Sequence, residues 1–149
     1  MTDALADIAA RRNDILERMQ AAARDARRDP SGVDLVAISK KQPDARIDAA
    51  LAAGQRLFGE NRVQEAQARW APRRAGNPEI ELRLVGPLQT NKAEQAVALF
   101  DVIETLDRPK LARELRKAMD KLGRTPRLYV QVNTGEEEQK AGVLPQDLA

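Results

Sequence analysis

Apolar residues recur with two different rhythms along this chain. From residue 3 to residue 28 they return about every 3.6 residues, and no glycine or proline interrupts them before Pro30. This pattern predicts one amphipathic helix over residues 3–28. Beyond it, short apolar runs typical of strands buried on both faces alternate with helical patterns. The predicted strands cover residues 35–39, 57–61, 82–86, 102–106 and 128–133.

The alternation of strands and helices predicts an α/β fold with parallel strands joined by right-handed crossovers. Two architectures fit it, an open doubly wound sheet and a (β/α)8 barrel. A barrel usually takes about 250 residues, and at least about 200, whereas this chain has 149. Periodicity and length favour the open sheet. A chain of this length is expected to form a single domain, residues 1–149.

Missing residue types narrow the chemistry. The chain has no cysteine and no histidine, which excludes a disulfide, a thiol nucleophile, cysteine- or histidine-ligated metal sites and a Ser-His-Asp triad. A metal site made only of carboxylates is still open, but no pattern in the sequence points to one, and we assign no metal. A net charge of +2 and an aromatic content of 3% argue against nucleic-acid binding. No apolar run reaches the roughly 18 residues of a membrane helix, so we expect a cytoplasmic protein that does not bind membranes.

Lys40 is the candidate with the clearest chemistry. It follows the first predicted strand, and the alternation of side chains puts Ile38 and Lys40 on one face of that strand. A lysine that continues an apolar face is partly desolvated, and Lys41 adds a second positive charge beside it. Both effects favour the neutral amine, so we expect a lowered pKa, which suits Schiff-base formation with an aldehyde. A lysine that extends to the surface explains the same pattern equally well.

Polar residues follow the other predicted strands as well, among them Asn61. In both parallel architectures the carboxyl ends of the strands face the ligand site. Helix capping or solvation accounts for each of these residues taken singly. The glycines are too scattered for a G-x-G-x-x-G motif and there is no Walker lysine pattern, so a dinucleotide-dependent enzyme is poorly supported.

Four segments carry a family resemblance. They read LVAISKKQP at residues 35–43, AGQRLFGENRVQEA at 53–66, GPLQTNK at 86–92 and VNTGEEEQKAGV at 132–143. In this order they resemble the pyridoxal phosphate homeostasis protein family. The resemblance implies a (β/α)8 barrel like the N-terminal domain of alanine racemase, with an additional helix at the N-terminus. It therefore replaces the open sheet as the expected fold.

The resemblance also implies a cofactor and the residues that hold it. Lys40 matches the lysine that binds pyridoxal 5′-phosphate as a Schiff base, and Asn61 is similar to a residue near the cofactor ring. Arg83 stands where many family members have histidine. A permanent cation there replaces a titratable group.

The chain shows five strand–helix units, and the last three expected of a barrel are absent. In the family, as in many barrels, loops after the late strands and a helix N-terminus hold the phosphate. A five-stranded arc also leaves two open edges. A fragment of a longer protein and a truncated product completed by another copy both fit the sequence.

The expected function is that of a non-catalytic protein of pyridoxal phosphate homeostasis, with the cofactor on Lys40, no catalytic residue and no amino-acid turnover. Enzymes that need pyridoxal phosphate are possible partners, and the oligomeric state is left open. One alternative is a fold-type III racemase or lyase that depends on pyridoxal phosphate. Another is a truncated barrel that binds a partner without the cofactor.

Overall fold

The computed structural model describes the backbone of residues 2–149 and the side chains from residue 6 onward. It divides into two compact units, one ending at Phe58 and the other covering Gly59–Ala149. The strands follow the order β1-β2-β3-β4-β5, so each strand pairs with the next one along the chain. The predicted alternation of strands and helices is therefore confirmed. A doubly wound sheet reverses its strand order, and this order never reverses, so the open sheet favoured by periodicity is wrong.

The first unit contains a long helix and the start of the sheet. Helix α1 (Thr2–Asp25) is followed by a 3-10 turn, η1 (Pro30–Gly32), strand β1 (Ala37–Ile38) and helix α2 (Asp44–Ala52). Strand β2 (Leu57–Glu60) begins in this unit and ends in the second. Helix α1 contacts α2, which agrees with an amphipathic rather than a solvent-surrounded helix.

A buried glutamine joins three segments of the first unit. The Gln55 carboxamide donates to the carbonyls of Leu35, at 2.7 Å, and Leu57, at 2.8 Å, and accepts from the Arg12 guanidinium at 2.9 Å. This interaction explains why β1 is shorter than the predicted 35–39. The Leu35 carbonyl binds a side chain instead of a neighbouring strand, and Ser39 already begins a turn.

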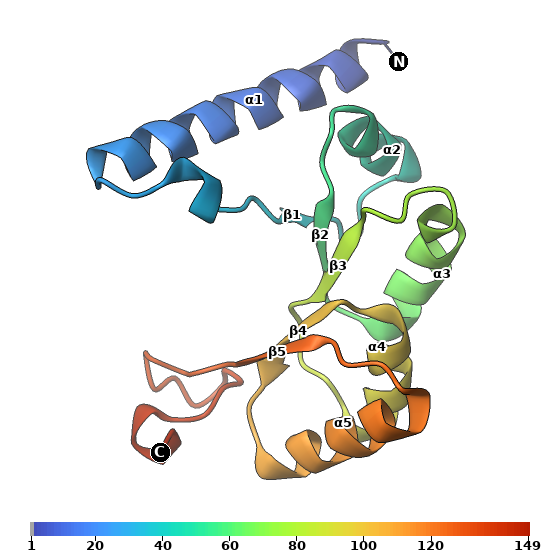
Figure 1. The fold of residues 1–149 in the computed structure, drawn as a ribbon, viewed down its shortest axis with the longest axis vertical. Helices are drawn as coiled ribbons and strands as arrows, with labels where there is room; N and C mark the ends of the chain where they lie inside the picture. Colours follow the sequence, from blue (N-terminus) through green and yellow to red (C-terminus); the bar gives the residue numbers. More distant parts are fainter. Residues whose placement is uncertain (1) are drawn as a thin grey trace. The chain divides into compact units, whose positions relative to one another are not determined.

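The second unit repeats strand and helix regularly. After β2 come α3 (Val63–Arg74), β3 (Glu81–Leu84), η2 (Thr90–Lys92), α4 (Ala93–Leu99), β4 (Val102–Leu106), α5 (Pro109–Leu122), β5 (Arg127–Val130) and η3 (Pro145–Asp147). Strand β4 pairs in parallel with both β3 and β5. Figure 1 shows α3, α4 and α5 on the same side of β3, β4 and β5. The core of this unit includes the wholly buried side chains of Leu82, Leu84, Ile103, Leu111 and Leu115.

Asp101 holds together the amino-terminal ends of the strands in this unit. Its carboxylate accepts hydrogen bonds at 2.8 Å from Arg74, from Arg124 and from the backbone N–H of Leu82. Its own backbone bonds to Leu82 in β3 and to Arg127 in β5. Both arginines also donate to carbonyls at the end of α4. Asp101 and the two arginines together therefore link three strands and two helices.

Gly86 allows the carboxyl ends of β2 and β3 to approach each other. A Cβ atom on Gly86 would lie 2.2 Å from the carbonyl oxygen of Asn61 and 2.8 Å from its Cα. Beside this contact, the N–H of Val85 donates to the Glu60 carbonyl at 2.9 Å. Only a residue without a side chain fits here, so the backbone of Asn61 is fixed by steric exclusion as well as by hydrogen bonding.

We predict that Asp101→Asn lowers the free energy of unfolding by about 2 kcal/mol, because an amide cannot satisfy both guanidinium groups and the Leu82 N–H. Urea denaturation measures the change. Asp120→Asn is the matched control, since Asp120 forms an exposed pair with Arg116 on α5, and such pairs contribute less than about 1 kcal/mol. Equal losses in the two variants would contradict the central role of Asp101.

We also predict that Gly86→Ala destabilises the protein by about 1–3 kcal/mol, because the new methyl group overlaps the Asn61 backbone. Gly76→Ala serves as the control, since a Cβ atom there meets nothing within 4 Å. Thermal and urea unfolding of both variants provide the comparison. Wild-type stability of Gly86→Ala would show that the two strand ends can separate freely.

Candidate functional site

Lys40 lies in a tight turn directly after β1, in the first unit. The N–H of Gln42 donates to the Ser39 carbonyl at 3.2 Å, which leaves Lys40 and Lys41 as the two central residues. Lys41 has a φ of 58°, in the left-handed region. A non-glycine residue in that region costs roughly 1–2 kcal/mol. The turn is therefore a defined local structure that presents two adjacent ammonium groups.

The predicted burial of Lys40 is wrong in this structure. Lys40 is exposed, and Ile38 on the same strand face is 47% exposed, whereas Ser39 on the opposite face is buried. The alternation of side chains thus holds, but the covered face is the one that carries Ser39. No described residue covers the Ile38 face sufficiently to desolvate the lysine. The Lys40 amine is accessible to a ligand from solvent.

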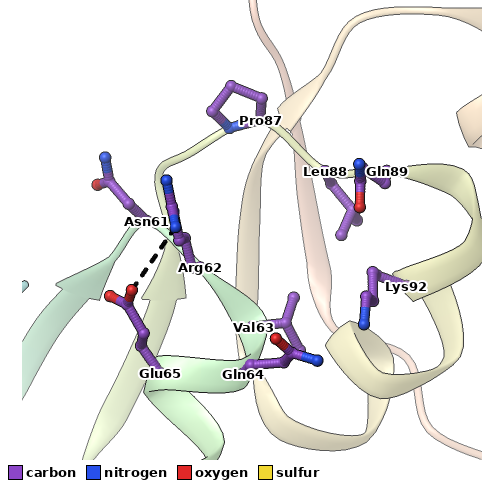
Figure 2. A pocket seen from close by; sticks show the side chains of 9 residues that line it. All are labelled: Asn61, Arg62, Val63, Gln64, Glu65, Pro87, Leu88, Gln89 and Lys92. Carbon is purple, nitrogen blue, oxygen red and sulfur yellow. Dashed lines mark ion pairs between the residues drawn. The ribbon is translucent and has the colours of Figure 1, made fainter.

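Asn61 follows β2 in the second unit and borders a cavity. The cavity has a volume of about 590 Å³ and lies between residues 61–65 and residues 87–92, as Figure 2 shows. It is thus formed where β2 leads into α3 and where β3 leads into η2. The Asn61 carboxamide makes no hydrogen bond to any residue that the structure describes, so it is available to a bound molecule.

Glu60, the residue before Asn61, is a buried carboxylate that sequence reasoning missed. Its side chain has no exposed surface, and it accepts hydrogen bonds at 3.0 Å from the Trp70 indole and from the Arg69 guanidinium. These bonds attach α3 to the end of β2. In the sequence, this interaction is indicated only by an acidic residue at the end of a predicted strand, followed by an arginine and a tryptophan on the next helix. Glu60 thereby fixes the chain on one side of Asn61.

Arg83 lies in β3 and is bound by two carboxylates. Its guanidinium donates to Glu81 at 2.8 Å and to Glu104 at 3.0 Å, and Arg127 also bonds to Glu81 at 2.8 Å. Only 11% of the Arg83 side chain is exposed. Burial is the largest single influence on its pKa and lowers it, but the hydrogen bonds and charges of Glu104 and Glu81 together raise the pKa above its ordinary value. Arg83 is a fixed, permanently charged group.

The sequence-predicted site residues have different surroundings. Lys40 belongs to the first unit, and Asn61 and Arg83 belong to the second. Asn61 lines the cavity, whereas Arg83 is not among the residues that line it. Asn61 and Arg83 therefore do not line the same cavity. Arg83 points to the face of β3 opposite Leu82 and Leu84, as strand alternation requires.

The segment 132–143, which carries part of the family resemblance, is a braced loop. Asn133 is buried, donates to the Glu137 carbonyl at 2.8 Å and accepts from the Glu137 N–H at 3.3 Å. Gly142 donates its N–H to Asp107, which follows β4. A side chain at Gly142, whose φ is 111°, would collide with the backbone of Asn133. Asn133 and Gly142 thus maintain the conformation of this loop.

Within the described part of the chain, no group of three or more acidic side chains is arranged to hold a metal ion. Among the described helices, none combines the length and the apolar content that crossing a membrane requires.

Comparisons with known proteins agree with the topology. The pyridoxal phosphate homeostasis protein of Pasteurella multocida is 35% identical over 134 residues, and that of Escherichia coli K12 is 33% identical over 138 residues. The matches cover 90% and 92% of this chain but 58% and 59% of those proteins. The chain therefore spans less than two thirds of these relatives. The resemblance seen in the sequence motifs is confirmed, and these relatives are named as homeostasis proteins rather than as enzymes.

Solved structures give the same result. PipY of Synechococcus elongatus, solved with pyridoxal phosphate bound, has a TM-score of 0.72 and 43% identity, covering 89% of this chain and 60% of PipY. A protein of Bifidobacterium adolescentis has a TM-score of 0.89 and 30% identity, covering 98% of this chain and 62% of its own. Residues 14–149 match the family described as alanine racemase, N-terminal domain. Together with the parallel strands in unbroken order, this match shows that the chain belongs to the alanine racemase N-terminal domain family.

Proposed function

We propose that this chain binds pyridoxal 5′-phosphate through a Schiff base on Lys40 and serves pyridoxal phosphate homeostasis without turning over amino acids. The observation that carries the proposal is the likeness to PipY, which has been solved with this cofactor bound and is 43% identical. The proposal includes a cytoplasmic location and, as partners, enzymes that require the cofactor.

Lys40 fits the covalent role because its amine is accessible at the centre of a defined turn. When bound, pyridoxal phosphate supplies an aldehyde that a neutral lysine amine attacks. The neighbouring Lys41 occupies the other central position of the turn. Both residues sit where the carboxyl end of β1 leads into a loop, which is the side on which parallel α/β folds place ligands.

Asn61 and Arg83 fit different parts of cofactor binding. The Asn61 carboxamide is available for a hydrogen bond, and Gly86 and Glu60 fix its backbone. The Arg83 guanidinium already bonds to Glu81 and Glu104, yet a guanidinium has further N–H donors. We assign Asn61 a direct contact with the ligand and Arg83 an electrostatic role as a fixed cation.

We predict that pyridoxal phosphate forms an adduct with the purified chain that borohydride reduction traps on Lys40. Lys40→Ala lowers the trapped adduct at least about tenfold, because the attacking amine is lost. Lys41→Ala is the matched control and keeps the adduct, since it changes the adjacent residue of the same turn. Absorbance spectra before and after reduction, followed by peptide mass mapping, measure both. An adduct located mainly on another lysine, or none on the wild-type chain, would overturn the proposal.

We predict further that the loaded protein does not racemise common amino acids, in keeping with relatives that are named as homeostasis proteins rather than as enzymes. Chiral chromatography of alanine and of other amino acids after prolonged incubation tests this. Racemisation that depends on Lys40 would replace the homeostasis role with that of a racemase.

A further inference from the structure

The cavity beside Asn61 has features of a binding site that do not depend on Lys40. Its lining comes from two segments of the second unit, residues 61–65 at the start of α3 and residues 87–92 between β3 and α4 (Figure 2). Its volume of about 590 Å³ lies within the roughly 300–1,000 Å³ that is usual for small-molecule sites. The cavity can therefore accept a small organic molecule.

Polar groups around the cavity have unused hydrogen-bonding capacity. The carboxamides of Asn61, Gln64 and Gln89 and the ammonium group of Lys92 form no hydrogen bond or ion pair within the described part of the chain. Some other lysines of the second unit are paired, and Lys121, for example, binds Glu94 at 2.9 Å on the protein surface. Three carboxamides and one ammonium group thus offer donors and acceptors to a ligand.

The charge of the lining favours an anion. Arg62 and Glu65 face each other at 3.8 Å and largely offset one another. Lys92, which is half-buried, has no such partner among the described residues. The remaining charge of the lining is therefore positive and is concentrated at Lys92.

Part of the lining is apolar. Pro87, which is exposed, borders the cavity, and Val63 and Leu88 also line it but have only 7% and 2% of their surface exposed. The ring of Pro87 therefore offers an apolar surface to a ligand, because covering it removes hydrocarbon from water. A purely inorganic anion would leave this surface unused.

We propose that this cavity binds a small organic anion, with its apolar part on Pro87 and its anionic group at Lys92. The exposed carboxamides of Gln64 and Gln89 orient the ligand by hydrogen bonding. Binding is reversible and non-covalent, and it does not need the Lys40 amine. The site is thus separate in its chemistry from the proposed Schiff base.

Phenyl phosphate is a suitable probe, because it combines a ring with an anion and has no aldehyde. Titration into the ¹⁵N-labelled full chain is followed through the side-chain NH2 resonances of Asn61, Gln64 and Gln89. We expect saturable shifts of these resonances. Lys92→Gln weakens binding about fivefold to tenfold, the loss typical of a charge-assisted hydrogen bond. Lys110→Gln, which removes the same charge from an exposed position on α5 outside the cavity, leaves the affinity unchanged.

Several outcomes would overturn this inference. One is the absence of saturable shifts, and another is an equal loss of affinity in Lys92→Gln and Lys110→Gln, which would indicate general attraction to a basic surface. Inorganic phosphate should bind more weakly than phenyl phosphate, and equal binding would refute the role of Pro87. Lys40→Ala should keep the shifts. Loss of the shifts in Lys40→Ala would indicate that the anion binds at Lys40 instead of Lys92. Failure to form the borohydride-trapped adduct would overturn the proposed function but would not affect the result of this titration.

Discussion

The order of the second unit depends on one carboxylate, that of Asp101. Two guanidinium groups and a backbone N–H converge on it, and the two arginines also hold the end of α4. A carboxylate that binds Arg74 and Arg124 at once is not easily replaced, because removing it leaves two partly buried cations without their partner. The contact fixes the amino-terminal ends of β3, β4 and β5. This network lies at the amino-terminal ends of the strands, whereas Asn61 follows the carboxyl end of β2.

The carboxyl ends of the strands are held by different means. At β2 and β3 the backbones are held in place by their close approach, since Gly86 has no room for a side chain beside Asn61. Glu60 adds a buried attachment to α3 through Trp70 and Arg69. Asn61 therefore has a fixed backbone and an available carboxamide, a combination that suits a binding residue because little conformational entropy is lost when a ligand is bound. Loops on a rigid base are where binding residues of such folds are usually found.

Much of the fold could be predicted from the sequence, because alternating apolar runs of two lengths dictate strands and helices. The exposure of Lys40 could not, since it depends on which face of β1 is covered, and alternation alone does not say so. In the sequence alone, nothing distinguishes Glu60 and Asp101 from ordinary surface charges. Only the three-dimensional arrangement shows that Glu60 binds a tryptophan and an arginine and that Asp101 binds two arginines. Arg83 was noticed as an unusual residue, but its partner Glu104 lies on another strand. That pairing follows from the register in which Arg83 lies beside Val102.

The charges around Arg83 bear on where an anionic ligand is recognised. Arg83 and Arg127 are balanced by Glu81 and Glu104, and all four are linked through hydrogen bonds at 2.8–3.0 Å. A balanced group of this kind has little net attraction for a phosphate, even though each member keeps its charge. Lysines without an ion-pair partner among the described residues include Lys40 and Lys41 in the turn of the first unit and Lys92 of the second. The Arg83 network therefore contributes order and local polarity to the strands, which is the electrostatic role proposed for it above.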